Sequence, residues 1–92
     1  MALIDDVKKT LRLNGNAADV EVQDLINAAK ADLSLVGITT VDEADTLIKR
    51  AITLYCKANY GYDNPEAARF QDSYEMLKAH LSISTEYTQA VT

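Results

Sequence analysis

The residues of this sequence best suited to chemistry are its single cysteine, Cys56, and its single histidine, His80. A cysteine acts as a nucleophile when a base lies beside it, but no catalytic motif surrounds either residue. One cysteine and one histidine are also too few ligands for a zinc site. We therefore expect Cys56 to be a small buried side chain, and we predict no enzymatic activity, no metal site and no cofactor.

A cluster of acids, Asp42, Glu43 and Asp45, is the next candidate, as a site for a divalent cation. The spacing does not match a calcium-binding loop, and no glycine stands among these acids to make the sharp turn that such a loop needs. Acids at the start of a helix cap its free N–H groups and complement its dipole. We expect this role here, with Asp42 or Thr40 as the cap.

The tyrosine-rich stretch of residues 55–66 suggests a third kind of site. Tyr55, Tyr60 and Tyr62 could stack on nucleic-acid bases, but such platforms lie in positively charged grooves and Lys57 is the only cation among them. We expect Tyr55 to lie in the core. We expect Tyr60 and Tyr62 to cover the turn after a helix, where they can also touch a neighbouring subunit.

Hydrophobic periodicity predicts the elements that position these residues: amphipathic helices over residues 3–12, 17–36, 43–60 and 64–82. We expect Asn14-Gly15-Asn16 to end the first helix, Gly37 the second, and Asn64-Pro65 to start the fourth. The third is apolar around most of its circumference and belongs in the middle of the bundle. The expected core consists of Leu3, Ile4, Val7, Leu11, Val22, Leu25, Ile26, Ala29, Leu33, Val36, Ala44, Leu47, Ile48, Ala51, Ile52, Leu54, Tyr55, Cys56, Ala58, Ala67, Phe70, Tyr74, Leu77 and Leu81.

The predicted fold class is thus all-α, a compact bundle of four helices. Residues 1–82 are expected to form one domain. Residues 83–92 are expected to form a flexible tail, extended or disordered, because Ile83, Tyr87 and Val91 are separated by polar residues without a helical stripe. Residues Ile38 to Val41 are β-branched throughout and are expected to cross between helices in extended form.

Composition narrows the class of protein. The chain has 92 residues, 48% of them hydrophobic, and a formal net charge of −5, which is typical of one small soluble domain and unfavourable for tight binding of duplex DNA. The opening MALIDDVKK lacks the positive region of a secretory signal, and no apolar run approaches the roughly 20 residues of a membrane span. We expect synthesis in a reducing cytoplasm and no contact with a membrane.

A helix-turn-helix is the main rival fold, because a Gly-containing turn joins the first two helices. The second helix would then enter the major groove of DNA. Its charged residues are mostly acids, which a phosphate-lined groove repels: Asp19, Glu21, Asp24 and Asp32 against Lys30.

The order of these segments resembles the head-tail connector proteins of tailed bacteriophages, the small head-completion adaptors also called DNA packaging proteins. The resemblance covers residues 3–82. It lies in the opening LIDDVKKTLRL, in VQDLINAAKADL of the second helix, in LIKRAITLYCKANYG of the third, in the Asn-Pro helix start and in the short polar tail. The connection between the third and fourth helices, Gly61-Tyr62-Asp63, is shorter than in some relatives.

The resemblance implies a structural function in the virion neck after assembly in the bacterial host cytoplasm. Such proteins form a ring of about a dozen subunits below the portal protein, extend the DNA channel after packaging, and dock the next neck or tail-completion protein. An acidic wall lets DNA slide through the channel without sequence-specific binding. The alternative is a small free-standing helical module that regulates by binding protein or DNA.

No portal-binding residue can be transferred from the family by motif. The outer charged positions of the first two helices are expected to form part of the contact between subunits. The expected partner-binding residues are Ile83, Tyr87 and Val91 of the tail, which can become ordered on a partner's sheet edge, together with Tyr60 and Tyr62.

Overall fold

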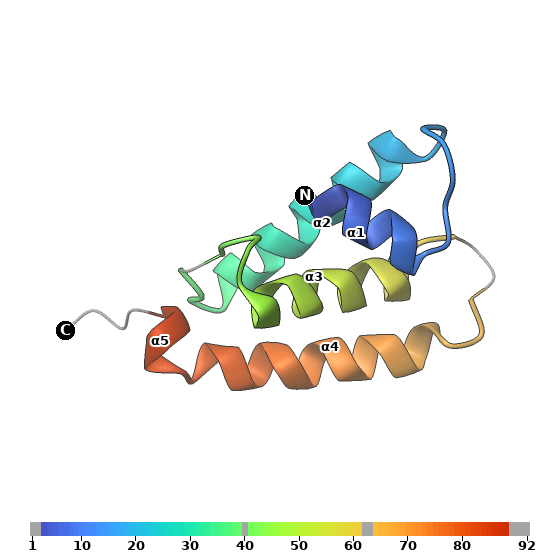
Figure 1. Cartoon of the computed structure of the whole chain (residues 1–92). Coiled ribbons are helices and arrows are strands. Elements are labelled where there is room, and N and C mark those ends of the chain that lie inside the picture. The colour runs from blue at the N-terminus through green and yellow to red at the C-terminus, as the bar shows by residue number, and fades with distance from the viewer. Residues whose placement is uncertain (1–2, 40, 62–63, 89–92) are drawn as a thin grey trace.

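The computed structural model describes residues 3–39, 41–61 and 64–88 (Figure 1). Within these ranges the chain is helical and contains no strand. The helices are α1 (Leu3–Thr10), α2 (Asp19–Leu35), α3 (Thr46–Asn59), α4 (Ala67–Ser82) and the single turn α5 (Thr85–Thr88). The four longer helices match the predicted bundle, although residues 11–18 form a longer connection than a helix-turn-helix uses.

Helix α3 lies in the middle of the bundle, as predicted. It packs against α1, α2 and α4, and α2 and α4 flank it on opposite sides (Figure 1). Consecutive side chains of α3 are buried because neighbours surround it: Ala51, Ile52, Thr53 and Leu54 are each at most 8% exposed. Apart from Ile38, the buried core outside α3 comes from one face of each surrounding helix.

The predicted core is largely confirmed, with exceptions near the helix ends. Val36 and Leu47 are 40% and 43% exposed, and Ala44 is exposed as well. Ile38, in contrast, is 1% exposed, although we expected only an extended crossing there. The cause is the end of α2, which turns the chain back so that Ile38 meets the core.

Gly37 produces this turn, as predicted, by adopting φ = 91°. The N–H of Gly37 donates to the carbonyl of Ser34 (3.1 Å) and that of Ile38 to the carbonyl of Leu33 (3.3 Å), which is a Schellman motif. Helix α1 ends in the same motif, but there Arg12 has the positive φ, 61°. The prediction that Asn14-Gly15-Asn16 ends α1 is therefore wrong, because the helix ends at Thr10 and the closing turn is complete at Arg12.

Replacing Gly37 with alanine should lower the free energy of unfolding by about 1 kcal/mol, because a Cβ is disfavoured at positive φ. Apart from its two chain neighbours, no described residue has an atom within 4 Å of the position that the Cβ would take, so the loss comes from backbone strain and not from a clash. Gly37→Asn should lose less, because asparagine tolerates this conformation. Urea denaturation measures both variants, and equal stability of Gly37→Ala and the wild type would contradict this explanation.

The start of α3 differs from the prediction. Asp45, and not Asp42, is its N-cap: the carboxylate accepts hydrogen bonds from the backbone N–H groups of Leu47 (2.9 Å) and Ile48 (3.1 Å). Asp42 instead accepts from the N–H of Ala44, within the preceding turn. The alternative cap Thr40 lies outside the described residues.

At the start of α4, Asn64 fixes the turn. Its side chain accepts from the N–H of Glu66 (3.1 Å) and donates to the carbonyl of Lys57 (2.6 Å), which ties the turn to the end of α3. The first residue of α4 is Ala67. The prediction that Asn64-Pro65 starts the fourth helix is therefore wrong by about one turn: Glu66 is the N-cap, and the Asn-Pro pair forms the turn just before α4.

The tail begins differently from the expectation of an extended or disordered chain, because residues 85–88 form the helical turn α5. This turn packs against the end of α4. It lies at the end of the bundle where α2 ends and α3 begins (Figure 1). The described tail is therefore part of the folded unit, and Val91 lies outside the described residues.

Candidate assembly surfaces

The residues predicted to bind partners do not form one site. Ile83 follows α4 directly and is 80% exposed, and Tyr87 lies close by in α5. Tyr60 follows α3 at the other end of the bundle, where it is half-buried against the core. Tyr62 and Val91 lie outside the described residues. The structure therefore brings Ile83 and Tyr87 to one end and leaves Tyr60 at the other.

Tyr87 fastens the tail to the junction between α2 and α3. Its hydroxyl donates to the carboxylate of Asp45, at 3.0 and 3.1 Å from the two oxygens. Its backbone carbonyl accepts from the N–H of Thr39 at 2.8 Å. The ring is half-buried and packs against the core. This contact could not be predicted from local patterns, because Tyr87 and Asp45 lie 42 residues apart along the chain.

Each acid of the acidic cluster has a partner within the chain. Asp45 caps α3, Asp42 fixes a turn, and Glu43 pairs with Lys30 of α2. Among residues 3–39, 41–61 and 64–88, no group of three or more histidine, cysteine or carboxylate side chains is arranged to hold a metal ion. The capping interpretation of these acids is thus confirmed for Asp45.

Cys56 is fully buried in the core, as expected. Burial removes water from the sulfur and raises the pKa of the thiol to about 12. The reactive thiolate is therefore scarce at neutral pH.

A thiol probe such as a disulfide reagent should accordingly label Cys56 at least about a hundredfold more slowly in the native protein than in urea. The labelling rate in each condition is followed by absorbance. A free-cysteine peptide under the same conditions controls for effects of urea on the reagent. Native labelling as fast as that of the unfolded chain would show an accessible thiol and would contradict the burial described here.

Charged side chains on α1 contribute to internal ion pairs. Lys8 pairs with Asp19 at the start of α2 (2.6 Å), and Asp6 pairs with Lys49 of α3 (3.2 Å). These pairs fasten the short helix α1 onto the bundle. They also leave fewer charges of α1 for the contact between subunits that the sequence suggested.

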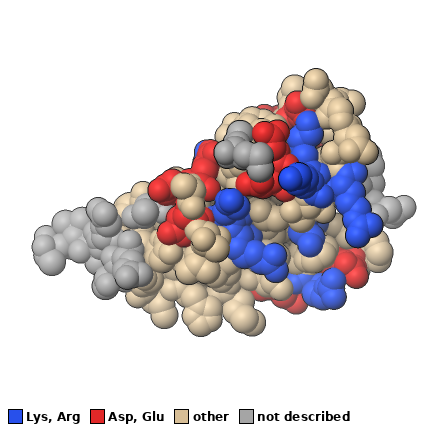
Figure 2. All heavy atoms as spheres, in the orientation of Figure 1, with Lys and Arg blue, Asp and Glu red and all other residues tan. Residues whose placement is uncertain are grey.

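The surface charge is unevenly distributed despite the net charge of −5. Figure 2 shows basic side chains gathered over the region of α1 and α3, and many acidic ones toward the opposite end of the same face. A shallow hollow of about 250 Å³ lies within the basic region between α1 and α3, and its lining consists of Asp6, Thr10, Thr46, Lys49, Arg50 and Thr53. Lys49 in this lining is paired with Asp6, so Arg50 is its one basic side chain without an ion pair among the described residues.

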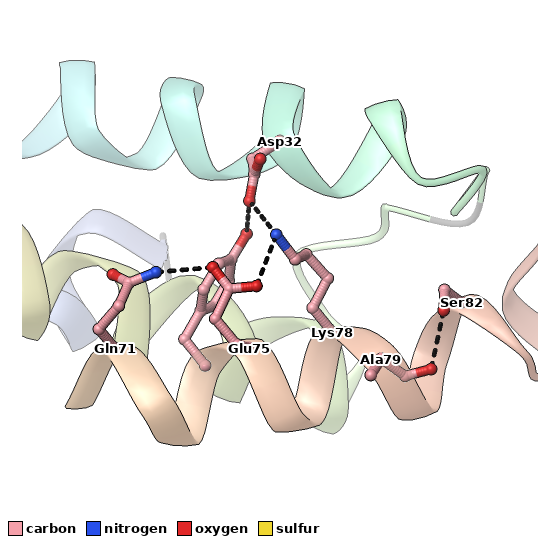
Figure 3. Close-up of polar contacts among 7 residues, drawn as sticks. Asp32, Gln71, Glu75, Lys78, Ala79 and Ser82 are labelled. Atoms are coloured by element: carbon pink, nitrogen blue, oxygen red, sulfur yellow. Dashed lines mark hydrogen bonds and ion pairs between the residues drawn. The ribbon is translucent and has the colours of Figure 1, made fainter. Parts of the chain in front are cut away.

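A polar cluster joins α2 to α4 beside α3 (Figure 3). Asp32 of α2 accepts hydrogen bonds from the hydroxyl of Tyr74 (2.5 Å) and the ammonium group of Lys78 (3.0 Å). Lys78 also pairs with Glu75 (3.0 Å), which accepts from Gln71 (2.7 Å). Tyr74 is 0% exposed, so its hydroxyl depends on Asp32 for a partner. The cluster fixes the spacing of the two outer helices.

The ionisation of this cluster follows from its contacts. The hydrogen bond from Tyr74 is the main cause that lowers the pKa of the Asp32 carboxyl, against burial, and Lys78 lowers it further. Burial and the bond to Asp32 raise the pKa of the Tyr74 phenol. Asp32 is therefore charged and Tyr74 neutral at physiological pH.

Comparison with known proteins extends these observations. The sequence model of the family described as "Phage connector protein" matches residues 3–88, which include every helix from α1 to α5. A search of curated proteins and a search of solved structures each found no match. None of the helices within the described residues is long and apolar enough to cross a membrane. The chain therefore belongs to the phage connector protein family, the connectors between the head and the tail of a phage.

Proposed function

We propose that this connector forms a ring below the portal protein, extends the DNA channel after packaging, and docks the next neck or tail-completion protein. The observation that carries the proposal is the family match, since it spans the whole folded unit and includes α5. Contacts with other head and tail proteins and a place in the virion neck follow from the family. What we propose beyond the family's general role is the ring, its position below the portal protein and its assembly after packaging.

The shape of the chain supports a place in a ring. The helices form a flat, elongated body with principal extents of 45 × 28 × 18 Å. The loops that join its longer helices lie at the two ends of the long axis (Figure 1). A subunit of this shape can present one end to the portal and the other to the next neck protein, while its long sides meet neighbouring copies.

We assign the portal to the end that carries Ile83 and α5. Ile83 is 80% exposed there, and Tyr87 fastens α5 to the bundle. Residues 89–92 follow α5 in the sequence. An extended segment can then add main-chain hydrogen bonds to a partner's sheet edge. We also propose that the basic region over α1 and α3 faces acidic surfaces of other neck proteins and not the DNA channel. A basic channel wall would bind the phosphates of DNA and stop it from sliding.

Co-sedimentation with the portal protein of the same phage genome tests the proposal. The full chain should sediment with portal rings, and a chain without residues 89–92 should bind more weakly. Absence of a complex with the full chain would reject the portal contact. Salt-dependent binding of duplex DNA by the free chain, without portal binding, would favour the alternative of a regulatory module.

A further inference from the structure

Within the described residues, helix α1 has the smallest contact with the bundle among the four longer helices. It has eight residues, and Leu3 and Val7 are the two that are buried. The two ion pairs described above, one with α2 and one with α3, hold its polar side. An isolated helix of this length is marginal in water, so α1 can leave the bundle as a unit while the other helices keep their own contacts.

The connection from α1 to α2, residues 11–18, contains no helix and is strained at one position. Arg12 adopts φ = 61° to close the turn after α1, a conformation that residues other than glycine disfavour. Figure 1 shows that the connection runs outside the helices. Eight extended residues span at most roughly 26–29 Å, enough to carry α1 beyond its own bundle. Straightening would release the strain at Arg12, and strained hinge loops favour exchange of the element that they join.

These features point to an exchange of α1 between copies. We propose that α1 of one copy docks on α2 and α3 of the next copy, in the place that it occupies in its own bundle, an inference that rests on the proposed ring. The docking site fits a second copy of this chain, because Leu3 and Val7 enter the same core and the same two ion pairs form, now between chains. Every contact of α1 is regained, so the exchange costs little beyond the association of the copies.

The exchange is head-to-tail and therefore suits a ring. Each copy gives its α1 to one neighbour and receives α1 from the other, a contact that repeats and closes when the rotation allows. In dilute solution the chain's own α1 competes at an effective concentration on the order of millimolar, so the closed monomer should predominate. Portal rings hold the copies side by side, so exchange should occur mainly after docking. The free chain should exchange only when concentrated.

Cross-linking of two different variants tests the exchange. Asp6→Cys places a thiol on α1 and Lys49→Cys places one on α3, where the native carboxylate and ammonium group lie 3.2 Å apart. This ion pair is partly exposed and weak, so folding should be preserved, which circular dichroism checks. On portal rings, a short flexible bismaleimide should join a mixture of the two variants at least tenfold more than either variant alone. Cys56 stays in place because its buried thiol reacts slowly.

Two controls define the reach of the reagent. The double variant Asp6→Cys/Lys49→Cys, as a dilute free chain, should be joined within one chain and give no dimers. Ser73→Cys, an exposed position on α4, replaces Lys49→Cys as the matched control, because α4 has no part in the proposed docking site. If Asp6→Cys is joined to Ser73→Cys as efficiently as to Lys49→Cys, the copies are merely close together and the inference is wrong.

The strained turn provides a second test that leaves the docking site unaltered. Arg12→Gly relieves the strain in the closed chain, so it should favour the closed form and lower the cross-link by about fivefold. Arg12→Ala removes the charge but keeps the strain, and should cross-link as well as the chain with Arg12. An equal fall in both variants, or no fall in Arg12→Gly, would show that Arg12 is not the hinge of an exchange.

The outcomes separate this inference from the proposed function. No cross-link between Asp6→Cys and Lys49→Cys, on portal rings or in the concentrated free chain, would overturn the exchange. Portal binding without the cross-link would leave the proposed function standing and reject the exchange alone. The cross-link in the concentrated free chain, without any portal binding, would support the exchange and reject the portal contact.

Discussion

Replacing Tyr74 with alanine is expected to lower the free energy of unfolding by about 3–5 kcal/mol, the usual loss for a buried aromatic side chain. Tyr74 is fully buried, and its ring meets Tyr55 edge to face with centroids 5.2 Å apart. Its removal leaves a cavity between α3 and α4 and takes one hydrogen bond from Asp32. The total free energy of unfolding of a small domain is roughly 5–15 kcal/mol, so the urea midpoint should fall markedly.

Tyr74→Phe separates the hydroxyl from the ring. This variant keeps the packing but removes the hydrogen bond to the charged Asp32, and should lose about 1.5–3 kcal/mol. Tyr55→Phe is the matched control, because no hydrogen bond of the Tyr55 hydroxyl is found within the described residues, and should lose less than about 0.5 kcal/mol. Equal losses in the two variants would show that the bond to Asp32 contributes nothing to stability.

The contribution of Asp32 should depend on pH. Its folded pKa is lowered below 3.8, so the unfolded chain binds more protons between the two pKa values. Stability that requires the charged carboxylate is present above about pH 5 and is lost as the pH falls through the lowered pKa. The difference between the wild type and Tyr74→Phe should therefore shrink in acid, and urea denaturation at several pH values measures it.

The second large effect is expected at Asp45, where alanine should lower the free energy of unfolding by about 2–3 kcal/mol. The carboxylate caps two N–H groups of α3 and accepts the hydroxyl of Tyr87. Its loss should also loosen α5. Hydrogen exchange can follow this locally, since the amide of Thr39 donates to the carbonyl of Tyr87 and should lose protection.

Asp45→Asn and Tyr87→Phe distinguish the two functions of Asp45. Asparagine is also a good N-cap, so Asp45→Asn should keep most of the stability of α3. Tyr87→Phe keeps the cap but removes the bond from α5, and should loosen the tail alone. If Asp45→Ala leaves exchange at Thr39 unchanged, Asp45 does not hold the tail in place.

Much of the fold could be predicted because it depends on local patterns. The apolar spacing of α2, α3 and α4 identified their core faces, and Gly37 marked the end of α2 through its tolerance of positive φ. The end of α1 could not be predicted in this way, because Arg12 adopts a conformation that its residue type disfavours. The prediction of the residue that caps α3 was wrong, because several nearby acids are equally suitable N-caps by residue type.

The polar contacts between distant segments could not be predicted. Asp32 looked like one more surface acid of α2, and only the tertiary fold brings it to Tyr74 and Lys78. The segment around Tyr87 likewise shows no helical spacing of apolar residues, yet the hydroxyl of Tyr87 donates to Asp45.

Cryo-electron microscopy of purified virions tests the central claim most directly. We expect a ring of this chain in the neck, between the portal and the next neck or tail protein. Mass spectrometry of the same virions identifies the polypeptide. Virions that infect normally but lack this chain, or that carry it elsewhere than at the portal vertex, would contradict the account.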